Sequence, residues 1–273
     1  MIVFYSTYSG TGKTKFITQV EIDEAKRGET VVVYSPELAD DDYLSLIASQ
    51  TVGFKRLDKG GLDCAGYISR ADYEETAAEL DKPTQRGTDF QFYVGHSLPY
   101  SDTDDILEFI EHTVRTTGAT RFVIDTVPAL VNECVGGGRE SKYDLEGRLI
   151  KRLSKIGIQY GTTFILIGQS NKEGEGLKET RKDEFGVLRG SRELSDICYA
   201  IYLLHRKRTG REDEKQELEN DALLIRIKGR QSGKGPKILP LHYKWECSTF
   251  FRREGGPTPD AAAPESDGET PAW

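Results

Sequence analysis

A run of small, hydroxyl-bearing and basic residues near the amino terminus has the composition of a phosphate-binding loop. It reads Thr7-Tyr8-Ser9-Gly10-Thr11-Gly12-Lys13-Thr14, follows an apolar segment directly and opens a helical pattern. Backbone N–H groups of such a loop wrap a polyphosphate, and the positive end of the following helix strengthens the attraction. Lys13 would reach the β- and γ-phosphates, and the Thr14 hydroxyl would be a Mg²⁺ ligand. We therefore predict a nucleotide and Mg²⁺ site that also uses Ser9, Gly10, Thr11 and Gly12.

The loop departs from the general pattern at its first position, where Thr7 replaces the expected Gly. This change alters how the loop bends, but the phosphate-binding half from Gly10 to Thr14 is intact. The alternative is a chance Gly-x-Gly-Lys-Thr match in an ordinary strand-to-helix turn. Because the strand and the helix stand where the motif requires them, we favour the nucleotide site.

A second polar position lies at the end of the apolar segment Arg121–Asp125. A carboxylate at the carboxyl end of a strand, beside a phosphate loop, can hold the water shell of a magnesium ion. Many acids simply end a strand and face solvent, which is the alternative here. The phosphate loop upstream favours the metal role, so we predict Asp125 as a metal-binding residue.

Two further strand ends carry polar side chains that suit nucleotide chemistry. Glu37 follows the buried segment Thr30–Tyr34, where a carboxylate beside the γ-phosphate could orient and deprotonate the attacking water. Gln169 follows the segment Thr163–Gly168, where an amide could contact the γ-phosphate. Either residue could equally be the solvated end of a strand, so both alternatives stay open at this point.

A pair of cations lies late in the sequence, in Arg226-Ile227-Lys228-Gly229-Arg230. Side chains alternate along a strand with period 2, so Lys228 and Arg230 share one face. Such a pair is typical of a solvated sheet edge. It gains a catalytic meaning if this face meets the nucleotide of another subunit, because an arginine can then stabilise transition-state charge in trans.

These positions need a scaffold in which several strand ends meet, and the sequence predicts one. Short β-branched segments alternate with longer helical patterns, which is typical of an α/β fold with a mostly parallel sheet covered by helices. The expected strands are Ile2–Ser6, Thr30–Ser35, Phe90–Val94, Arg121–Asp125, Thr163–Gly168 and Cys198–Leu204. Apolar residues spaced by three and four predict helices over Asp102–Thr117 and Tyr143–Tyr160.

The pattern changes after Leu204. Three segments read as successive strands joined by short turns, which predicts an antiparallel edge on the sheet. They are Ala222–Arg230, Lys237–Tyr243 and Ser248–Arg252. Before them, Arg206–Asn220 is highly charged and is expected to be exposed. We thus expect a single domain over residues 1–253.

Negative charge is concentrated at the carboxyl terminus. The net charge is −8, but five of the 45 acids and none of the 37 bases lie in residues 254–273, so residues 1–253 carry 40 acids against 37 bases. The acidic balance therefore does not exclude nucleic acid as a partner. Residues 254–273 are rich in Pro, Ala, Gly and acids, and we expect them to form a disordered acidic tail.

Three features favour a cytoplasmic protein. No window approaches the roughly 18 apolar residues of a membrane span. Met1 runs directly into the apolar segment Ile2–Tyr5 without a basic region or a cleavage site, which argues against secretion. The cysteines at positions 64, 134, 198 and 247 are too far apart for a zinc site or a dense disulfide framework, and they suit a reducing cytosol. For a phage-encoded chain, this would be the host cytoplasm.

Taken together, these motifs resemble the motor domain of DnaB-type hexameric replicative helicases, in particular phage and mitochondrial members. The resemblance spans about residues 1–252, and its signatures occur in the family's order. Besides the phosphate loop before Phe16, they are Ser35-Pro36-Glu37-Leu38, Ile124-Asp125, Gly168-Gln169-Ser170-Asn171, Leu188-Arg189-Gly190-Ser191, Leu194-Ser195-Asp196, Lys228-Gly229-Arg230 and Thr249-Phe250. The stretch Ile68–Leu80 is similar to the helical insert after the family's second strand.

The resemblance implies a RecA-like P-loop fold, hydrolysis of Mg²⁺-ATP and movement along single-stranded DNA in a homo-oligomeric, hexameric ring. It implies Glu37 as the base that activates water, Asp125 for magnesium and Gln169 as the γ-phosphate sensor. It also implies that Lys228 and Arg230 reach the ATP of the neighbouring subunit.

Two DNA-binding loops are implied as well, at Asn132–Tyr143 and Lys172–Gly190. Both are basic and contain glycine, which suits a flexible contact with the DNA backbone that reads no base sequence. Ordinary solvated surface loops have the same composition, so that alternative stays open. The DNA-binding residues implied in this way are Arg139, Lys142, Asn171, Lys172, Lys178, Arg181, Lys182, Arg189 and Gly190.

Members of the family carry an amino-terminal domain and a linker helix, whereas this sequence begins at its first strand. We expect either a shortened chain or a single-domain relative with a weaker or different ring, which bears on unwinding more than on ATP hydrolysis. A recombinase-like strand-exchange ATPase shares the fold and the loops, but it tends to carry lysines where this chain has Arg230. A non-motor module that only coats DNA and a small-molecule phosphotransferase are further alternatives.

The acidic tail ends in Trp273, beside the terminal carboxylate. Aromatic residues supply much of the burial in a small interface, and nearby acids steer it toward a basic pocket. Tails of this kind look like those with which some phage replication proteins dock a partner. We therefore expect Trp273 to anchor a replication protein, and a merely solubilising tail is the alternative.

Overall fold

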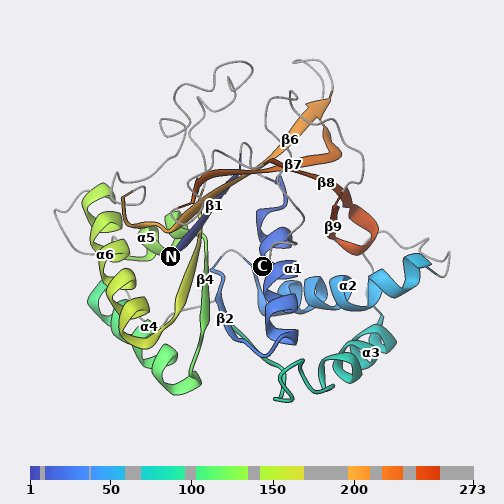
Figure 1. The fold of residues 1–273 in the computed structure, drawn as a ribbon, viewed down its shortest axis with the longest axis horizontal. Coiled ribbons are helices and arrows are strands. Elements are labelled where there is room, and N and C mark those ends of the chain that lie inside the picture. Colours follow the sequence, from blue (N-terminus) through green and yellow to red (C-terminus); the bar gives the residue numbers. More distant parts are fainter. Residues whose placement is uncertain are drawn as a thin grey trace, which may run out of the picture.

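The computed structural model describes residues 1–6, 10–36, 38–58, 69–95, 103–134, 142–168, 196–209, 217–229 and 238–252. Nine strands within these residues form one sheet, in the order β3-β2-β4-β5-β1-β6-β7-β8-β9. The sheet runs through the middle of the molecule and has helices on both sides (Figure 1).

Most of the sheet is parallel, as the alternating sequence pattern predicts. The parallel strands are β1 (Ile2–Ser6), β2 (Thr30–Tyr34), β3 (Gln91–Gly95), β4 (Arg121–Asp125), β5 (Thr163–Ile167) and β6 (Ala200–Thr209). Strands β7 (Glu217–Gly229), β8 (Ile238–Lys244) and β9 (Thr249–Arg252) extend it antiparallel. The predicted α/β fold with an antiparallel carboxyl-terminal edge is therefore confirmed.

Helices cover both faces of this sheet. On one side lie α1 (Lys13–Lys26), α2 (Asp40–Asp58) and α3 (Arg70–Leu80), and on the other α4 (Thr103–Thr117), α5 (Val127–Cys134) and α6 (Lys142–Tyr160) (Figure 1). Successive side chains of a strand point to opposite faces, so each strand contributes to two cores. On β4, for example, Phe122 and Ile124 belong to the core under α4–α6, whereas Val123 belongs to the core under α1 and α2.

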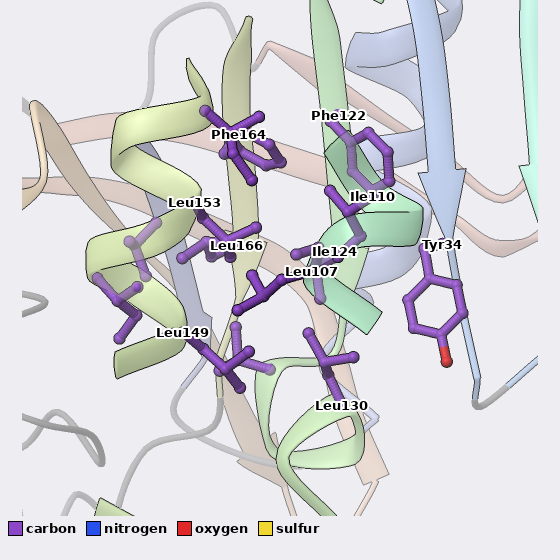
Figure 2. Packing of buried hydrophobic residues seen from close by; sticks show 14 of the residues in the cluster. Tyr34, Leu107, Ile110, Phe122, Ile124, Leu130, Leu149, Leu153, Phe164 and Leu166 are labelled. Atoms are coloured by element: carbon purple, nitrogen blue, oxygen red, sulfur yellow. The ribbon is translucent and has the colours of Figure 1, made fainter. Parts of the chain in front are cut away.

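The core under α4–α6 is built from the helix stripes that the apolar spacing predicts. Figure 2 shows Leu107 and Ile110 of α4 and Leu149 and Leu153 of α6 against the strand residues beneath them. Because both faces of the central strands are covered in this way, the strands are apolar throughout rather than alternating. This continuous apolar composition is the signal from which the strands could be predicted.

Helix α1 is attached to the first residue of β4 by a buried ion pair. Arg121 donates from Nε to Glu21 Oε2 over 2.6 Å and from Nη2 to Glu21 Oε1 over 2.8 Å. Glu21 is only 1% exposed. Burial raises the pKa of Glu21, and the bidentate hydrogen bonds and positive charge of Arg121 oppose that rise. The pair holds the middle of α1 against the amino end of β4.

One expectation about the later strands is wrong. The charged segment Arg206–Asn220 is partly strand rather than linker, because β6 continues to Thr209 and β7 begins at Glu217, although Asn220 is exposed as expected. Arg206 is 6% exposed. The strands pair across this segment, and Arg206 finds backbone acceptors that stabilise its buried charge. Within the described residues, no helix is long and apolar enough to cross a membrane.

Candidate active site at the carboxyl edge of the sheet

The phosphate-binding loop leaves the carboxyl end of β1, in the middle of the sheet between β5 and β6. Its described part has Gly10 at φ +77° and Gly12 at φ +97°, with Thr11 fully buried between them. These left-handed conformations suit glycine and rarely other residues. The chain then enters α1 at Lys13, as the motif predicts.

The first turn of α1 has the electrostatics of an anion site. The positive end of a helix dipole favours acids in the first turn, yet this turn holds Lys13 and Lys15 and no acid. No side chain caps the helix either, since the N-cap residue is Gly12. Cations at an uncapped positive helix end are unfavourable by themselves, and a bound polyphosphate would relieve that repulsion.

Lys13 is held close to the loop in this structure. Its Nζ donates to the Ser6 hydroxyl over 2.8 Å, and Ser6 is 1% exposed at the end of β1. The ammonium group therefore lies beside the strand end from which the loop starts. From there it is within reach of a phosphate bound by the loop's N–H groups.

Asp125 joins the phosphate loop although 111 positions separate it from Thr14. The Thr14 hydroxyl donates to Asp125 Oδ2 over 2.8 Å, and the Ser35 hydroxyl approaches the same oxygen at 3.5 Å. Asp125 and Ser35 are 1% and 0% exposed. The peptide bond after Asp125 is cis. The ends of β4 and β2 lie side by side in the register, which is why Ser35 and Asp125 meet.

These side chains fit the predicted magnesium ion. Mg²⁺ prefers oxygen ligands and is usually held by one or two carboxylates together with waters and substrate phosphates. The hydroxyl of Thr14, the carboxylate of Asp125 and the hydroxyl of Ser35 form such an oxygen-only set next to the phosphate loop. Ser35 stands in the signature Ser35-Pro36-Glu37-Leu38 but had no predicted role, and the structure brings it to Asp125.

Arg206 is a second residue that sequence reasoning missed. Its Nη1 donates to the Thr11 carbonyl of the phosphate loop over 3.4 Å, and its Nε donates to the Glu219 carbonyl over 2.8 Å. The guanidinium lies 4.7 Å from the ring centre of Tyr243, whose hydroxyl accepts from Lys15 Nζ at 2.8 Å. Burial lowers the pKa of the Arg206 guanidinium from its ordinary value, but an arginine keeps its charge in proteins. It therefore adds positive charge behind the loop.

Lys228 lies away from the phosphate loop of its own chain. On β7 it pairs with Ile201 of β6, whereas Leu224 pairs with Leu204, which in turn pairs with Ser6 at the loop. Counted on β6, three residues separate the level of Lys228 (Ile201) from the level of the loop (Leu204), or about 10 Å, because the register shifts between Ile201 and Tyr202. This cation lies toward the amino ends of the parallel strands, away from the phosphate loop of its own chain.

The remaining predicted site residues lie outside the described residues, or have side chains that are not described. They are Ser9, Glu37, Arg139, Lys142, Gln169, Asn171, Lys172, Lys178, Arg181, Lys182, Arg189, Gly190 and Arg230. Residues next to Glu37 and Gln169 in the sequence are described, and they lie at the carboxyl edge of the sheet. Ser35 and Pro36 follow β2, and Gly168, whose N–H donates to the Phe4 carbonyl over 2.8 Å, follows β5 at the same edge.

The segments predicted to bind DNA connect to this edge too. Helix α5 ends at Cys134 and α6 begins at Lys142, so the helices extend into both ends of the predicted loop Asn132–Tyr143. The predicted loop Lys172–Gly190 lies between the carboxyl end of β5 and residue 196, outside the described residues. Because α6 leads into the amino end of β5, its own start lies toward the carboxyl edge.

Comparison with solved structures identifies the fold. A structure described as an ATPase domain superposes with a TM-score of 0.64 and 14% identity over 93% of this chain and 84% of that one. A DnaB-like replicative helicase, described with its interactions with primase, gives 0.67 and 15% over 93% of this chain and 59% of that one. A KaiC-like protein from the hyperthermophilic archaeon Pyrococcus horikoshii gives 0.57 and 18% over 93% and 89%.

The chain therefore shares the fold of these solved structures, which is the fold that the sequence resemblance implies. It spans little more than half the length of the DnaB-like helicase. The sequence matches no family model and no curated protein. At these identities the likeness extends to the fold, and the chemistry has to be argued from the site itself.

Proposed function

We propose that this chain is a Mg²⁺-ATP-driven motor that moves along single-stranded DNA, as one subunit of a DnaB-type helicase ring. The observation that carries the proposal is the meeting of the phosphate loop with Asp125, through the 2.8 Å hydrogen bond from Thr14. A loop for phosphates and a buried carboxylate for a cation, placed side by side at the carboxyl edge of a RecA-like sheet, are what hydrolysis of a nucleoside triphosphate requires.

In this proposal each side chain has a separate task. The N–H groups around Gly10 and Gly12 bind the phosphate oxygens, and Lys13 exchanges its Ser6 partner for the β- and γ-phosphates. Thr14 and Asp125 would hold a magnesium ion, which would supply positive charge to the phosphates. Glu37 would deprotonate the attacking water. Gln169 would contact the γ-phosphate and transmit its presence to the DNA-binding segment that follows it.

The position of Lys228 supports hydrolysis at the interface between subunits. Lys228 lies about 10 Å along the sheet from the level of its own loop, toward the amino ends of the parallel strands. We propose that Lys228 and Arg230 stabilise the transition-state charge on ATP in the neighbouring subunit. The site would then be complete only in a homo-oligomer, and a hexameric ring is the assembly we propose.

Steady-state ATPase measurements with and without single-stranded DNA test the proposal. Lys13→Ala should reduce turnover at least about a hundredfold, because Lys13 is the one cation in the loop sequence from Thr7 to Thr14. Lys26→Ala, in the last turn of the same helix, is the matched control and should hydrolyse ATP like the wild type. Wild-type turnover in Lys13→Ala, or no stimulation by DNA, would contradict the proposal.

Mixed oligomers test the interface directly. Arg230→Ala should bind ATP normally but lose turnover, and Lys13→Ala should lose turnover for a different reason. In mixed rings, some interfaces pair an intact loop with an intact Arg230 of the neighbour, so partial activity should return. Absence of rescue in demonstrably mixed rings would mean that Arg230 does not act in trans.

The fold is shared with a KaiC-like protein as well as with helicases, so a RecA-like ATPase that does not unwind DNA is the second candidate. A forked-duplex assay separates the two, because only a helicase displaces the paired strand. Strand exchange between homologous DNAs without displacement of a fork would instead indicate a recombinase-like ATPase.

For the acidic tail we propose a docking role, with Trp273 as the anchor and the five acids as a salt-sensitive attraction. Deleting residues 255–273 should leave ATPase activity nearly intact and weaken binding of a replication protein. Trp273→Ala alone should reproduce much of that loss. Recovery of the same partners with and without the tail would show that it is only a solubilising segment.

A further inference from the structure

The carboxyl-terminal hairpin of β8 and β9 lies directly against the phosphate loop. A Cβ built on Gly12 would stand 3.1 Å from Phe250 Cζ and 3.3 Å from Cε2, which is tighter than most real contacts. Phe250 is 4% exposed, so its ring fills the space beneath this glycine. The loop therefore rests on a side chain from β9, the last strand of the described chain.

Phe250 is held in place by Gln19, which lies on α1 beyond the phosphate-binding residues. Gln19 Nε2 donates to the Phe250 carbonyl and the Phe250 N–H donates to Gln19 Oε1, both over 2.8 Å. The glutamine amide thus bonds both backbone polar groups of Phe250, much as a neighbouring strand would. Because β9 is the last strand of the described sheet, this amide provides pairing that no described strand provides there.

A second glutamine bridges the same two elements. Gln50 of α2 donates from Nε2 to the Lys15 carbonyl over 2.7 Å and to the Ser248 carbonyl over 2.8 Å. The ring of Phe250 also packs edge-on against Phe16 of α1, with ring centres 5.6 Å apart. The hairpin is therefore joined to the first turns of α1 by polar bonds from two helices and by an aromatic contact.

We propose that Phe250 is a positioning residue of the phosphate loop. Its ring supports the backbone of Gly12, and the hydrogen bonds from the Gln19 amide hold Phe250 in place. This inference rests on the proposed nucleotide site and names a residue that supports it without touching the ligand. Backbone N–H groups bind phosphate well only when they converge on it, so a small displacement of Gly12 weakens every such bond at once.

The proposal makes a specific statement about which ligands are affected. Phe250 acts on the loop that holds the phosphates, so its loss should weaken binding of inorganic tripolyphosphate as much as binding of Mg²⁺-ATP. A residue that acted on the base or ribose would weaken ATP alone. A residue that served only to stabilise the fold would weaken neither ligand in the folded protein.

Competition titrations against a fluorescent ATP analogue measure both affinities. Phe250→Leu should raise the Kd for Mg²⁺-ATP and for tripolyphosphate by the same factor, about tenfold. Gln19→Met keeps the ring but removes both hydrogen bonds, and it should raise both values about threefold. Phe164→Leu is the matched control, since Phe164 is 1% exposed and packs in the core on the opposite face of the sheet. It should lower the melting temperature yet leave both values within about twofold.

The outcomes separate this inference from the proposed function. If the wild type binds neither ligand, the nucleotide site is wrong and the positioning role falls with it. If the wild type binds both and Phe250→Leu binds them equally well, the site stands and the positioning role is wrong. Weaker binding of ATP by Phe250→Leu, with unchanged binding of tripolyphosphate, would also overturn the positioning role. Should Phe250→Leu fail to fold, the parallel rise predicted for Gln19→Met decides the question alone.

Discussion

Helix α1 is bonded to β4 at two places, and the chemistry of the two bonds differs. Near the start of the helix, the Thr14 hydroxyl donates to Asp125, the last residue of the strand. Two turns later, Glu21 receives two hydrogen bonds from Arg121, the first residue of the strand. Both carboxylates are 1% exposed. Burial alone therefore does not distinguish a carboxylate that could bind a metal ion from one that only stabilises the fold.

The partners of the two acids make the distinction. A guanidinium that binds a carboxylate in two places neutralises it within the fold, and the pair is then a structural attachment. A hydroxyl can rotate and offer its own lone pairs, so Thr14 and Asp125 can turn from a hydrogen-bonded pair into two ligands of one cation. We therefore propose that the end of β4 with the hydroxyls is the reactive end, and that the end with the arginine is the anchored one.

The largest expected effect breaks the reactive end. Asp125→Asn keeps the size and can still bond to Thr14, but an amide does not neutralise a divalent cation. ATP turnover should fall about a thousandfold, which corresponds to roughly 4 kcal/mol in the activation barrier. The melting temperature should change by no more than a few degrees. Steady-state kinetics and thermal unfolding on the same preparation check both statements, and near-normal turnover would remove Asp125 from the mechanism.

Breaking the anchored end should have the opposite profile. Glu21→Gln leaves the Arg121 guanidinium, 18% exposed, with a longer contact of 3.8 Å to Glu24 in place of its bidentate partner. Loss of one partner of a buried pair should lower the free energy of unfolding by about 3 kcal/mol. The turnover of the folded protein should stay within about twofold of the wild type. Chemical denaturation measures the first value, and a large loss of turnover at a temperature where the variant is folded would contradict the comparison.

A smaller change sharpens the role of the hydroxyls. Ser35→Ala removes the weaker contact with Asp125, at 3.5 Å, and leaves the Thr14 contact in place. We expect the Mg²⁺ concentration for half-maximal ATPase activity to rise about fivefold, with little change in turnover at saturating Mg²⁺. Magnesium titration of the ATPase rate checks this. An unchanged midpoint would mean that Ser35 only packs beside the site.

The smallest effect concerns an exposed ion pair near the anchored end. A hydrogen bond from Thr120, helped by Arg86 at 2.6 Å, holds the pKa of Glu29 below its ordinary value of 4.5. A carboxyl with a depressed pKa in the folded state stabilises the fold above about pH 4.5, and this stabilisation is lost as the pH falls through the folded pKa. Glu29→Gln should therefore cost only about 0.5 kcal/mol at pH 7, because the pair is near the surface. Denaturation curves of the two proteins should converge in acid, and a constant difference would contradict the assignment.

Strands β1 to β5 could be predicted from the sequence to within one residue at each end, whereas β6 begins two residues later and ends five residues later than expected. Strands β1 and β4 have the expected bounds, because strands covered on both faces are continuous apolar runs with polar residues at each end. The phosphate loop and Asp125 could be found for the same reason, since the motif and the acid stand at strand ends. Their meeting then follows from parallel topology, in which all carboxyl ends lie at one edge.

The residues that support the site could not be predicted in this way. Arg206, Phe250 and the Glu21–Arg121 pair act through contacts between residues 100 or more positions apart, and although Thr249-Phe250 is one of the signatures quoted above, no local pattern predicts these contacts. An arginine in a charged stretch is typical of an exposed linker, whereas Arg206 is buried by the paired strands, the Tyr243 ring and the phosphate loop. Side chains alternate along a strand, so Tyr202 and Leu204 are followed by Arg206 on the same face. This alternation is the one sequence signal that could have predicted a longer β6. The roles of Glu37, Gln169 and Arg230 stay predictions, because these residues lie outside the described ones.

The central claim is that the two ends of β4 have different tasks, and the Mg²⁺ dependence of ATP binding tests it most directly. Calorimetric titrations with and without Mg²⁺ would compare the wild type with Asp125→Asn and Glu21→Gln. We predict that Mg²⁺ tightens ATP binding to the wild type and to Glu21→Gln by the same factor, and that it has almost no effect on Asp125→Asn. A wild-type response to Mg²⁺ in Asp125→Asn, or its loss in Glu21→Gln, would contradict the account.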